Sequence, residues 1–235
     1  MLTDLIVRTL EYTGSALVAD LPEPDASDPP RSDGQPVVVV GGLATTAPVL
    51  EPLAGWLAGL GYRVHPLAIG AGLDCATRSV EAVSGHVREV ARTSGRPVVL
   101  VGYSRGGQFA RVAAARTPHD VAGLVTLGTP FDLFRLGGPV LLAAGALVAA
   151  GSAGLPGLAR LSCLFGSCCR EFRAQLRGPW PSDIPFTSIY SAADRVVPAR
   201  ASIDPAARNV EVPGSHIELL TGVSARAAVA DALTR

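Results

Sequence analysis

The segment Pro97-Val-Val-Leu-Val-Gly-Tyr-Ser-Arg-Gly-Gly107 decides the fold. Its first part is an unbroken apolar run, which predicts a strand buried on both faces in the middle of a parallel sheet. The residues from Gly106 to Arg116 have the pattern of a helix. Ser104 therefore stands on a tight turn between a buried strand and a helix. Such a turn projects a serine hydroxyl from the edge of a sheet, where it is suited to act as a nucleophile.

Strand-like and helix-like segments alternate on both sides of this turn. Short β-branched runs such as Val37–Val40 alternate with segments in which apolar residues recur at helical spacing, as they do from Val80 to Val90. Strands are predicted over 37–40, 62–67, 97–101, 121–127, 186–190 and 210–212, and helices over 47–60, 80–93, 106–116 and 218–233. The alternation predicts an α/β fold with a mostly parallel central sheet and helices on both faces.

Three regions follow from where this alternation begins, stops and resumes. Residues 1–35 are predicted to hold an N-terminal helix, over about 2–20, and a Pro-rich linker. Residues 36–130 and 183–235 form the predicted core. Residues 131–182 interrupt the alternation and are predicted to be an inserted cap, or lid.

An uncharged stretch lies inside this predicted cap. No residue from Leu136 to Ala159 is charged, and the stretch is long enough to span a bilayer. It is rich in Gly and Ala, however, and Pro139 and Pro156 bracket it. A membrane-spanning segment would also divide elements that must pack together, so a cap helix is the preferred interpretation. Contact with a membrane surface through residues 1–20 or through the cap stays open.

The composition predicts a buried core and no nucleic-acid partner. Apolar residues make up 48% of the chain and charged residues 17%, which is ample for a buried core. The formal net charge is zero and the arginines are scattered, so no surface for nucleic acid is predicted. The segment Met1-Leu-Thr-Asp4 lacks a basic region followed by an apolar run, so no signal peptide is predicted and a cytoplasmic location is expected.

A serine alcohol needs a base, and His216 is the predicted one. In proteins with a serine on such a turn, the acid and then the histidine follow it along the chain. His65 and His86 precede Ser104, and His119 lies at the far end of the next strand. His216 comes just after the last predicted strand, at the same edge of the sheet as the serine.

Asp194 is the predicted acid. It lies in Tyr190-Ser-Ala-Ala-Asp194, shortly after a predicted strand. From this position its carboxylate can accept a hydrogen bond from the imidazole and stabilise the imidazolium. Asp132 and Asp204 are the rival candidates.

Two backbone amides are predicted to hold the oxyanion that forms during attack on a carbonyl. One is the amide of Arg105, directly after the nucleophile, and the other is that of Leu43, after the paired glycines Gly41 and Gly42. Both roles belong to the backbone.

Substrate contacts are predicted at Tyr103, beside the nucleophile, and at Leu141, Leu142 and Leu147 in the cap. The three leucines could line an apolar pocket that favours acyl chains. Alternatively, they only pack the cap onto the core.

The four cysteines predict buried thiols or one local disulfide. Three of them lie in Cys163-Leu-Phe-Gly-Ser-Cys168-Cys169, and the fourth is Cys75. A zinc site is disfavoured because the histidines are elsewhere and no second Cys-x-x-Cys pair exists. Adjacent Cys168 and Cys169 cannot point the same way, so at most one of them is expected to reach Cys163 or Cys75. No metal and no organic cofactor is predicted.

The chain resembles the α/β-hydrolase superfamily, in particular its lipase and esterase branch. The resemblance runs from Pro36 to the C-terminus, apart from the cap. The motifs that carry it are Val40-Gly-Gly-Leu43, Gly102-Tyr-Ser-Arg-Gly-Gly107, Leu127-Gly-Thr-Pro130, Tyr190-Ser-Ala-Ala-Asp194 and Gly214-Ser-His216. The cysteine cluster is similar to that of an actinobacterial lipase-like subgroup. Many lipases have His-Gly in place of Gly41-Gly42, and Gly-His-Ser in place of Gly102-Tyr103-Ser104.

The resemblance implies hydrolysis of a carboxylic ester through an acyl-enzyme, with a small, apolar ester or acyl compound as substrate. Acyl transfer, lactonisation and thioester cleavage are alternatives, because the triad does not decide which nucleophile accepts the acyl group. A catalytically silent binding module is a further alternative, against which the three triad residues argue.

Overall fold

The computed structural model describes residues 32–43, 45–69, 74–132, 138–156 and 158–234, without the side chains of 138–141, 143 and 164. The helix predicted over residues 2–20 lies outside the described residues.

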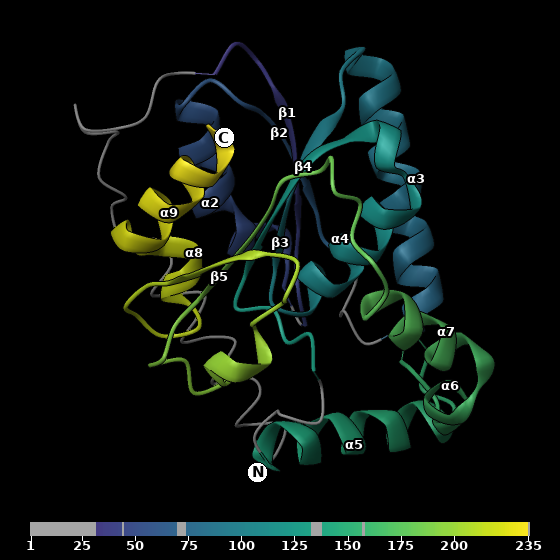
Figure 1. The fold of residues 1–235 in the computed structure, drawn as a ribbon. Coiled ribbons are helices and arrows are strands. Elements are labelled where there is room, and N and C mark those ends of the chain that lie inside the picture. Colours follow the sequence, from purple (N-terminus) through teal and green to yellow (C-terminus); the bar gives the residue numbers. More distant parts are fainter. Residues whose placement is uncertain (1–31, 44, 70–73, 133–137, 157, 235) are drawn as a thin grey trace.

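A six-stranded parallel sheet forms the centre of the molecule, with the strand order β2-β1-β3-β4-β5-β6 (Figure 1). Its strands are β1 (Pro36–Val40), β2 (Arg63–Leu67), β3 (Val98–Tyr103), β4 (Val121–Leu127), β5 (Phe186–Tyr190) and β6 (Arg208–Glu211). All five residues of β1 are buried, because helices cover both faces of the sheet. The predicted α/β fold, with its parallel central sheet, is confirmed.

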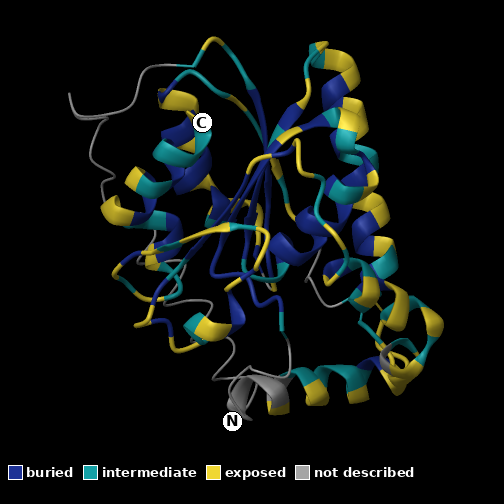
Figure 2. Ribbon diagram, viewed as in Figure 1, coloured by how far each residue is buried: buried dark blue, intermediate teal, exposed yellow. Residues whose placement is uncertain are grey.

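Two layers of helices enclose the sheet. The helices are α2 (Ala47–Gly59), α3 (Ala76–Ser94), α4 (Arg105–Arg116), α5 (Gly138–Ser152), α6 (Leu161–Phe165), α7 (Ser167–Leu176), α8 (Glu218–Thr221) and α9 (Val223–Leu233). Helices α2, α8 and α9 cover one face, and α3, α4 and α7 cover the other (Figure 1). The side chains of β1 alternate between two apolar cores, with Val37 in one and Val38 in the other. Figure 2 shows the buried sheet and the exposed outer faces of the helices.

The largest differences between the predicted and the observed helices lie in α3 and at Gly222. Helix α3 begins at Ala76 rather than at Val80, because its first turn carries small and polar residues without an apolar pattern. The helix predicted over 218–233 is interrupted at Gly222, whose backbone is extended, with φ −72° and ψ 144°.

The predicted cap region contains α5, α6 and α7. Helix α7 packs against α3 and α4, and its Phe172 and Leu176 are buried in the core. Helix α5 lies beyond the edge of the sheet where the strands end (Figure 1). No helix in the described part of the chain is both long and apolar enough to cross a membrane.

Candidate active site

Ser104 stands on the turn between β3 and α4, as the sequence predicts. Its φ of 53° is the only positive φ of a non-glycine residue in the described ranges. The turn is held by the Ser104 amide, which donates a hydrogen bond of 2.8 Å to the carbonyl of Leu127 on the neighbouring strand. A strained backbone of this kind persists where the surrounding structure enforces it, and it is characteristic of functional turns.

The loop after β1 presses closely against this turn. A Cβ on Gly42 would lie 2.8 Å from Ser104 Cβ and 2.9 Å from the carbonyl oxygen of Tyr103. Only glycine fits at this position without a shift of the backbone. Strands β1 and β3 are neighbours in the sheet, and their following helices, α2 and α4, lie on opposite faces. This is the switch point at which open α/β sheets place their ligands.

Ser104, His216 and Asp194 form a chain of hydrogen bonds. His216 Nε2 lies 3.0 Å from Ser104 Oγ, and His216 Nδ1 lies 2.6 Å from Asp194 Oδ2. The side chain of Asp194 is 1% exposed and that of His216 is 13% exposed. Asp194 Oδ1 accepts hydrogen bonds of 2.8 Å from the amides of Val196 and Val197. The second oxygen of the carboxylate is therefore directed at the imidazole.

Two residues that the prediction did not assign to the histidine hold it in place. Tyr103 packs its ring against the imidazole, with ring centroids 5.0 Å apart, and its hydroxyl donates a hydrogen bond of 3.2 Å to the His216 carbonyl. Gly128, in Leu127-Gly-Thr-Pro130, has a φ of 54°, and a Cβ there would lie 3.0 Å from two ring atoms of His216. The glycine of this motif therefore leaves the space that the imidazole occupies.

Hydrogen bonds on both sides of His216 fix the loop that carries it. Ser191 Oγ donates a hydrogen bond of 2.5 Å to the carbonyl of Gly214. Glu218 Oε2 accepts hydrogen bonds of 2.6 Å from the amide and the hydroxyl of Ser215, which closes the start of α8. These bonds lower the pKa of Glu218.

The two amides predicted for an oxyanion hole belong to the two segments that meet at Gly42. Leu43 follows Gly42 in the loop after β1, and a Cβ on Gly42 would lie 3.1 Å from the amide nitrogen of Arg105. Arg105 is the first residue of α4, so its amide has no partner within the helix. Leu43 lies in the turn after β1. The hydroxyl of Thr45 accepts a hydrogen bond of 3.1 Å from the Gly42 amide and donates one of 3.4 Å to the Leu43 carbonyl. Thr45 thereby fixes the shape of this loop, which the sequence pattern did not reveal.

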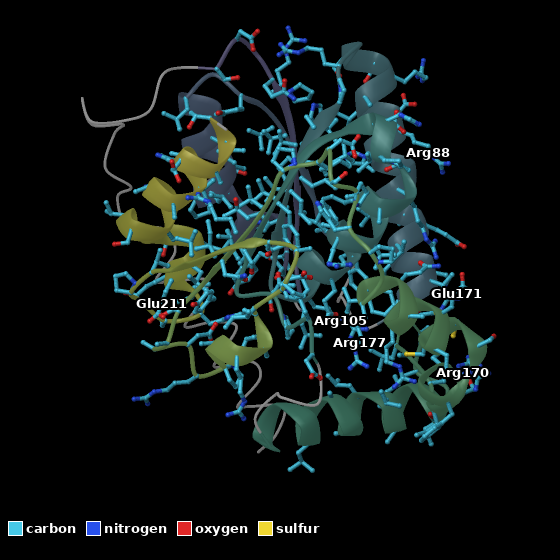
Figure 3. All side chains as sticks on the ribbon, in the orientation of Figure 1. Arg88, Arg105, Arg170, Glu171, Arg177 and Glu211 are labelled. Atoms are coloured by element: carbon cyan, nitrogen blue, oxygen red, sulfur yellow. The ribbon has the colours of Figure 1, made fainter. Side chains whose placement is uncertain are left out.

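The side chain of Arg105 lies between the core and the cap region (Figure 3). Its guanidinium stands 5.4 Å above the ring centroid of Phe109. Burial lowers the pKa of Arg105, and the nearby Cys169 acts in the opposite direction.

The predicted substrate contacts have different surroundings. Tyr103 is only 5% exposed and contacts the histidine, so little of its surface is left for a substrate; burial, with the nearby charge of Asp194, raises its pKa. Leu142 is 77% exposed on α5, and Leu147 is half-buried. The side chain of Leu141 lies outside the described part of the structure.

The rival acids lie elsewhere. Asp132 is 3.7 Å from Arg177, and Asp204 forms a buried ion pair of 2.7 Å with Arg111. Both carboxylates line a hollow of about 490 Å³ that includes Trp180 but does not include Ser104, His216 or Asp194. Each rival therefore has an arginine partner, whereas Asp194 has the histidine.

Comparison with known proteins agrees with this fold. Residues 18–146, more than half of the chain, match the family model of the alpha/beta hydrolase fold, and the chain therefore belongs to this family. A search of curated proteins finds no match.

Similar solved structures include three enzymes or candidate enzymes of this fold. The mature lipase BlEst2 of Bacillus licheniformis is 21% identical with a TM-score of 0.57, over 86% of this chain and 91% of the lipase. A monoacylglycerol lipase of Paleococcus ferrophilus is 16% identical with a TM-score of 0.58, over 84% and 95%. The putative non-heme bromoperoxidase BpoC of Mycobacterium tuberculosis is 19% identical with a TM-score of 0.57, over 87% and 92%. At these identities the likeness concerns the fold.

Proposed function

We propose that this protein is a serine hydrolase that cleaves carboxylic esters through an acyl-enzyme. The observation that carries the proposal is the hydrogen-bond chain from Ser104 through His216 to Asp194, with distances of 3.0 and 2.6 Å. The strained backbone of Ser104 supports it, because a nucleophile must project from its turn.

In the first half of the reaction Ser104 Oγ attacks the ester carbonyl, and His216 Nε2 takes its proton. The resulting imidazolium is stabilised by Asp194, which keeps Nδ1 protonated and the ring oriented. His216 then gives the proton to the departing alkoxide, which leaves as the alcohol. The acyl group stays on Ser104.

In the second half water attacks the acyl group. His216 takes a proton from the water and returns it to Ser104 Oγ as the carboxylic acid leaves. In both halves the amides of Leu43 and Arg105 donate hydrogen bonds to the oxyanion. Such donors stabilise a tetrahedral intermediate by several kcal/mol, roughly 3–4 for each donor.

An apolar acyl chain is the proposed substrate group. Leu142 and Leu155 expose 77% and 57% of their surface in the cap region, which also contains the exposed Phe165. Helix α5 lies beyond the carboxyl edge of the sheet, the edge at which Ser104 stands (Figure 1). An apolar chain that left the site toward α5 would cover this exposed surface and gain hydrophobic free energy.

A fluorophosphonate probe and a panel of p-nitrophenyl esters of increasing chain length test the proposal. Wild type should be labelled and should turn over the esters, whereas Ser104→Ala and His216→Ala should do neither at a comparable rate. Ser182→Ala, at an exposed loop serine, is the matched control and should behave as wild type.

The outcomes separate the alternatives. If wild type is labelled but releases almost no acid, the acyl group is transferred to another acceptor, such as an alcohol or thiol, and the hydrolase proposal fails. If wild type is not labelled, or if Ser104→Ala retains full activity, the mechanism is wrong and a binding module becomes the better interpretation.

A further inference from the structure

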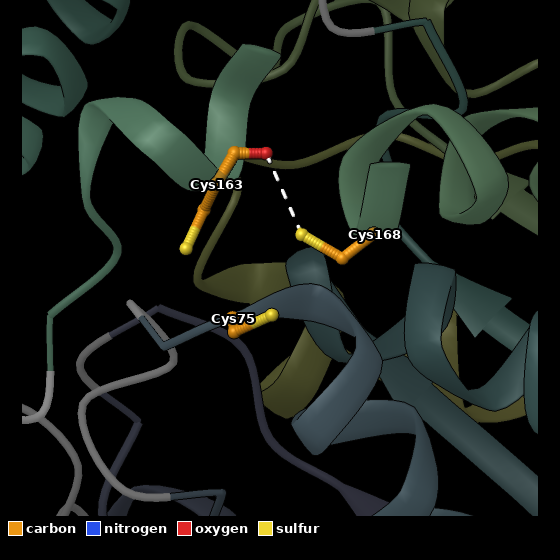
Figure 4. Close-up of side chains that lie close together, drawn as sticks. All are labelled: Cys75, Cys163 and Cys168. Atoms are coloured by element: carbon orange, nitrogen blue, oxygen red, sulfur yellow. Dashed lines mark hydrogen bonds between the residues drawn. The ribbon is translucent and has the colours of Figure 1, made fainter. Parts of the chain in front are cut away.

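Two neighbouring cysteines of the cap region meet a third from far upstream in the sequence, outside the candidate active site (Figure 4). Cys75 precedes α3, Cys163 lies in α6, and Cys168 lies near the start of α7. Their sulfur atoms all lie within 4.8 Å of one another, and all three residues are half-buried. The Cys168 thiol also donates a long hydrogen bond of 3.7 Å to the Cys163 carbonyl.

We propose that Cys75, Cys163 and Cys168 form a binding site for a thiophilic divalent cation such as Zn²⁺. Zinc binds thiolate sulfur at about 2.3 Å, which places the sulfurs of a tetrahedral site about 3.8 Å apart. The observed cluster needs only a small contraction to reach this geometry. Three protein ligands leave the fourth position for a small ligand from solvent.

The number of converging thiols favours a metal over a disulfide. A disulfide joins two sulfurs and leaves the third without a role, whereas a soft metal ion uses all three. Adjacent Cys169 is not part of the cluster. The sequence alone disfavours a zinc site because the chain has no second Cys-x-x-Cys pair. The fold, however, brings Cys75 from far upstream to Cys163 and Cys168 as an additional sulfur donor.

Binding of the cation would release protons and change the charge of the site. Each thiol that coordinates the ion releases its proton to solvent, so a divalent cation with three thiolates carries a net charge of −1. Arg78, in the first turn of α3, forms an ion pair with Asp74 and also interacts electrostatically with Cys75 and Cys163, so its guanidinium can offset part of this charge. Cys75 is the N-cap residue of α3, where the positive end of the helix dipole favours a thiolate.

The site would join the cap region to the core. Cys163 and Cys168 come from α6 and α7, whereas Cys75 belongs to the segment that starts α3. A bound ion would hold these elements together, in addition to the apolar contacts of α7 with α3 and α4. Zinc should therefore raise the melting temperature of the chain by several degrees at concentrations well above its dissociation constant.

Titration of the fully reduced full-length chain with Co²⁺ under anaerobic conditions tests the site. We expect one Co²⁺ per chain, thiolate-to-cobalt charge-transfer absorption of a strength that corresponds to three thiolates, and displacement by one equivalent of Zn²⁺. Cys75→Ser, Cys163→Ser and Cys168→Ser should each lose about a third or more of this absorption and weaken binding about tenfold or more. Cys169→Ser is the matched control and should bind as wild type does.

The proposal fails if reduced wild type shows no charge-transfer absorption, a result that does not depend on how the variants fold. It also fails if Cys75→Ser binds Co²⁺ as wild type does, or if Cys169→Ser loses as much absorption as Cys168→Ser. Mass spectrometry of the isolated protein can also reveal a disulfide that includes Cys75. If such a disulfide is found and the reduced chain does not bind Co²⁺, the cysteines form a disulfide and not a metal site.

Discussion

The arrangement of Ser104, His216 and Asp194 depends on contacts of single atoms. The imidazole of His216 has Asp194 on one side, the Tyr103 ring against it, and the missing Cβ of Gly128 beneath it. The carboxylate is satisfied by three donors, of which two are backbone amides. Each of these contacts fixes the orientation of the imidazole or of the carboxylate beside it.

Asp194→Asn should lower kcat by roughly 10³- to 10⁴-fold with little change in KM or in stability. The amide keeps an oxygen for the two backbone donors but can present an N–H to the ring, which favours the wrong tautomer of His216. Ester hydrolysis measured under saturating conditions checks this. Asp132→Asn, at the rival acid near Arg177, is the control and should keep almost full activity. Equal losses in the two variants would contradict the assignment of the acid.

Gly128→Ala should reduce both activity and stability. The new methyl would lie 3.0 Å from two ring atoms of His216, and the backbone φ of 54° disfavours alanine. We expect a loss of about 1–3 kcal/mol in the free energy of unfolding, and a fall in kcat that exceeds any change in KM. Gly55→Ala is a matched control, because a Cβ there meets no atom within 4 Å and Gly55 lies in α2. If urea unfolding and kinetics give wild-type values for Gly128→Ala, the space at Gly128 is not needed.

Helix α4 and the loop before β6 are joined by a buried ion pair. Arg111 Nε donates a hydrogen bond of 2.7 Å to Asp204 Oδ2, and both side chains are less than 5% exposed. Arg111 also donates a hydrogen bond of 3.2 Å to the carbonyl of Gly178, at the end of the predicted cap region. The pair therefore connects three segments that are distant in sequence.

Asp204→Ala should lower the free energy of unfolding by about 3–5 kcal/mol, because it leaves the buried charge of Arg111 without its partner. Adding Arg111→Met to this variant should recover at least about 1 kcal/mol, since the unpaired charge is then removed. Urea unfolding of wild type, both single variants and the double variant provides the measurement. Strictly additive losses would show that the pair is not energetically coupled.

In the whole molecule, the two helix layers bury the central strands, whereas the edge strands β2 and β6 stay partly exposed. The carboxyl edge of the sheet carries the loops with Ser104, Asp194 and His216. Helix α5 lies beyond this edge and exposes apolar side chains rather than packing them into the core (Figures 1 and 2). Its position determines where an acyl chain could find apolar surface.

Leu142→Glu should lower kcat/KM for long-chain esters by about tenfold or more and leave short-chain esters nearly unchanged. Only a long acyl chain can reach Leu142. Burial of a leucine side chain by such a chain contributes about 1.5–3 kcal/mol to binding. Val223→Glu is the control: Val223 is 72% exposed at the start of α9, in the layer that does not carry the cap region. A p-nitrophenyl ester series measures the effect, and an equal loss at every chain length would exclude a specific contact at α5.

Local patterns in the sequence predicted the sheet, and they also selected Ser104, His216 and Asp194, which the structure brings together. An apolar run fixes a buried strand, and the glycines around Ser104 fix the turn, so strand β4 agrees with its prediction residue for residue. The order of residues along the chain then selected His216 and Asp194. Helix α3 was predicted, but its first turn and the break at Gly222 were missed because small and polar residues carry little periodic signal.

Other features were decided only by the tertiary structure. The ring contact of Tyr103, the space at Gly128 and the pairing of the rival Asp204 with Arg111 depend on which strand ends become neighbours. The convergence of Cys75 with Cys163 and Cys168 depends on α7 packing against α3. A sequence specifies backbone conformation and burial over a few residues, whereas contacts between distant residues exist only once strand order and helix packing have placed them.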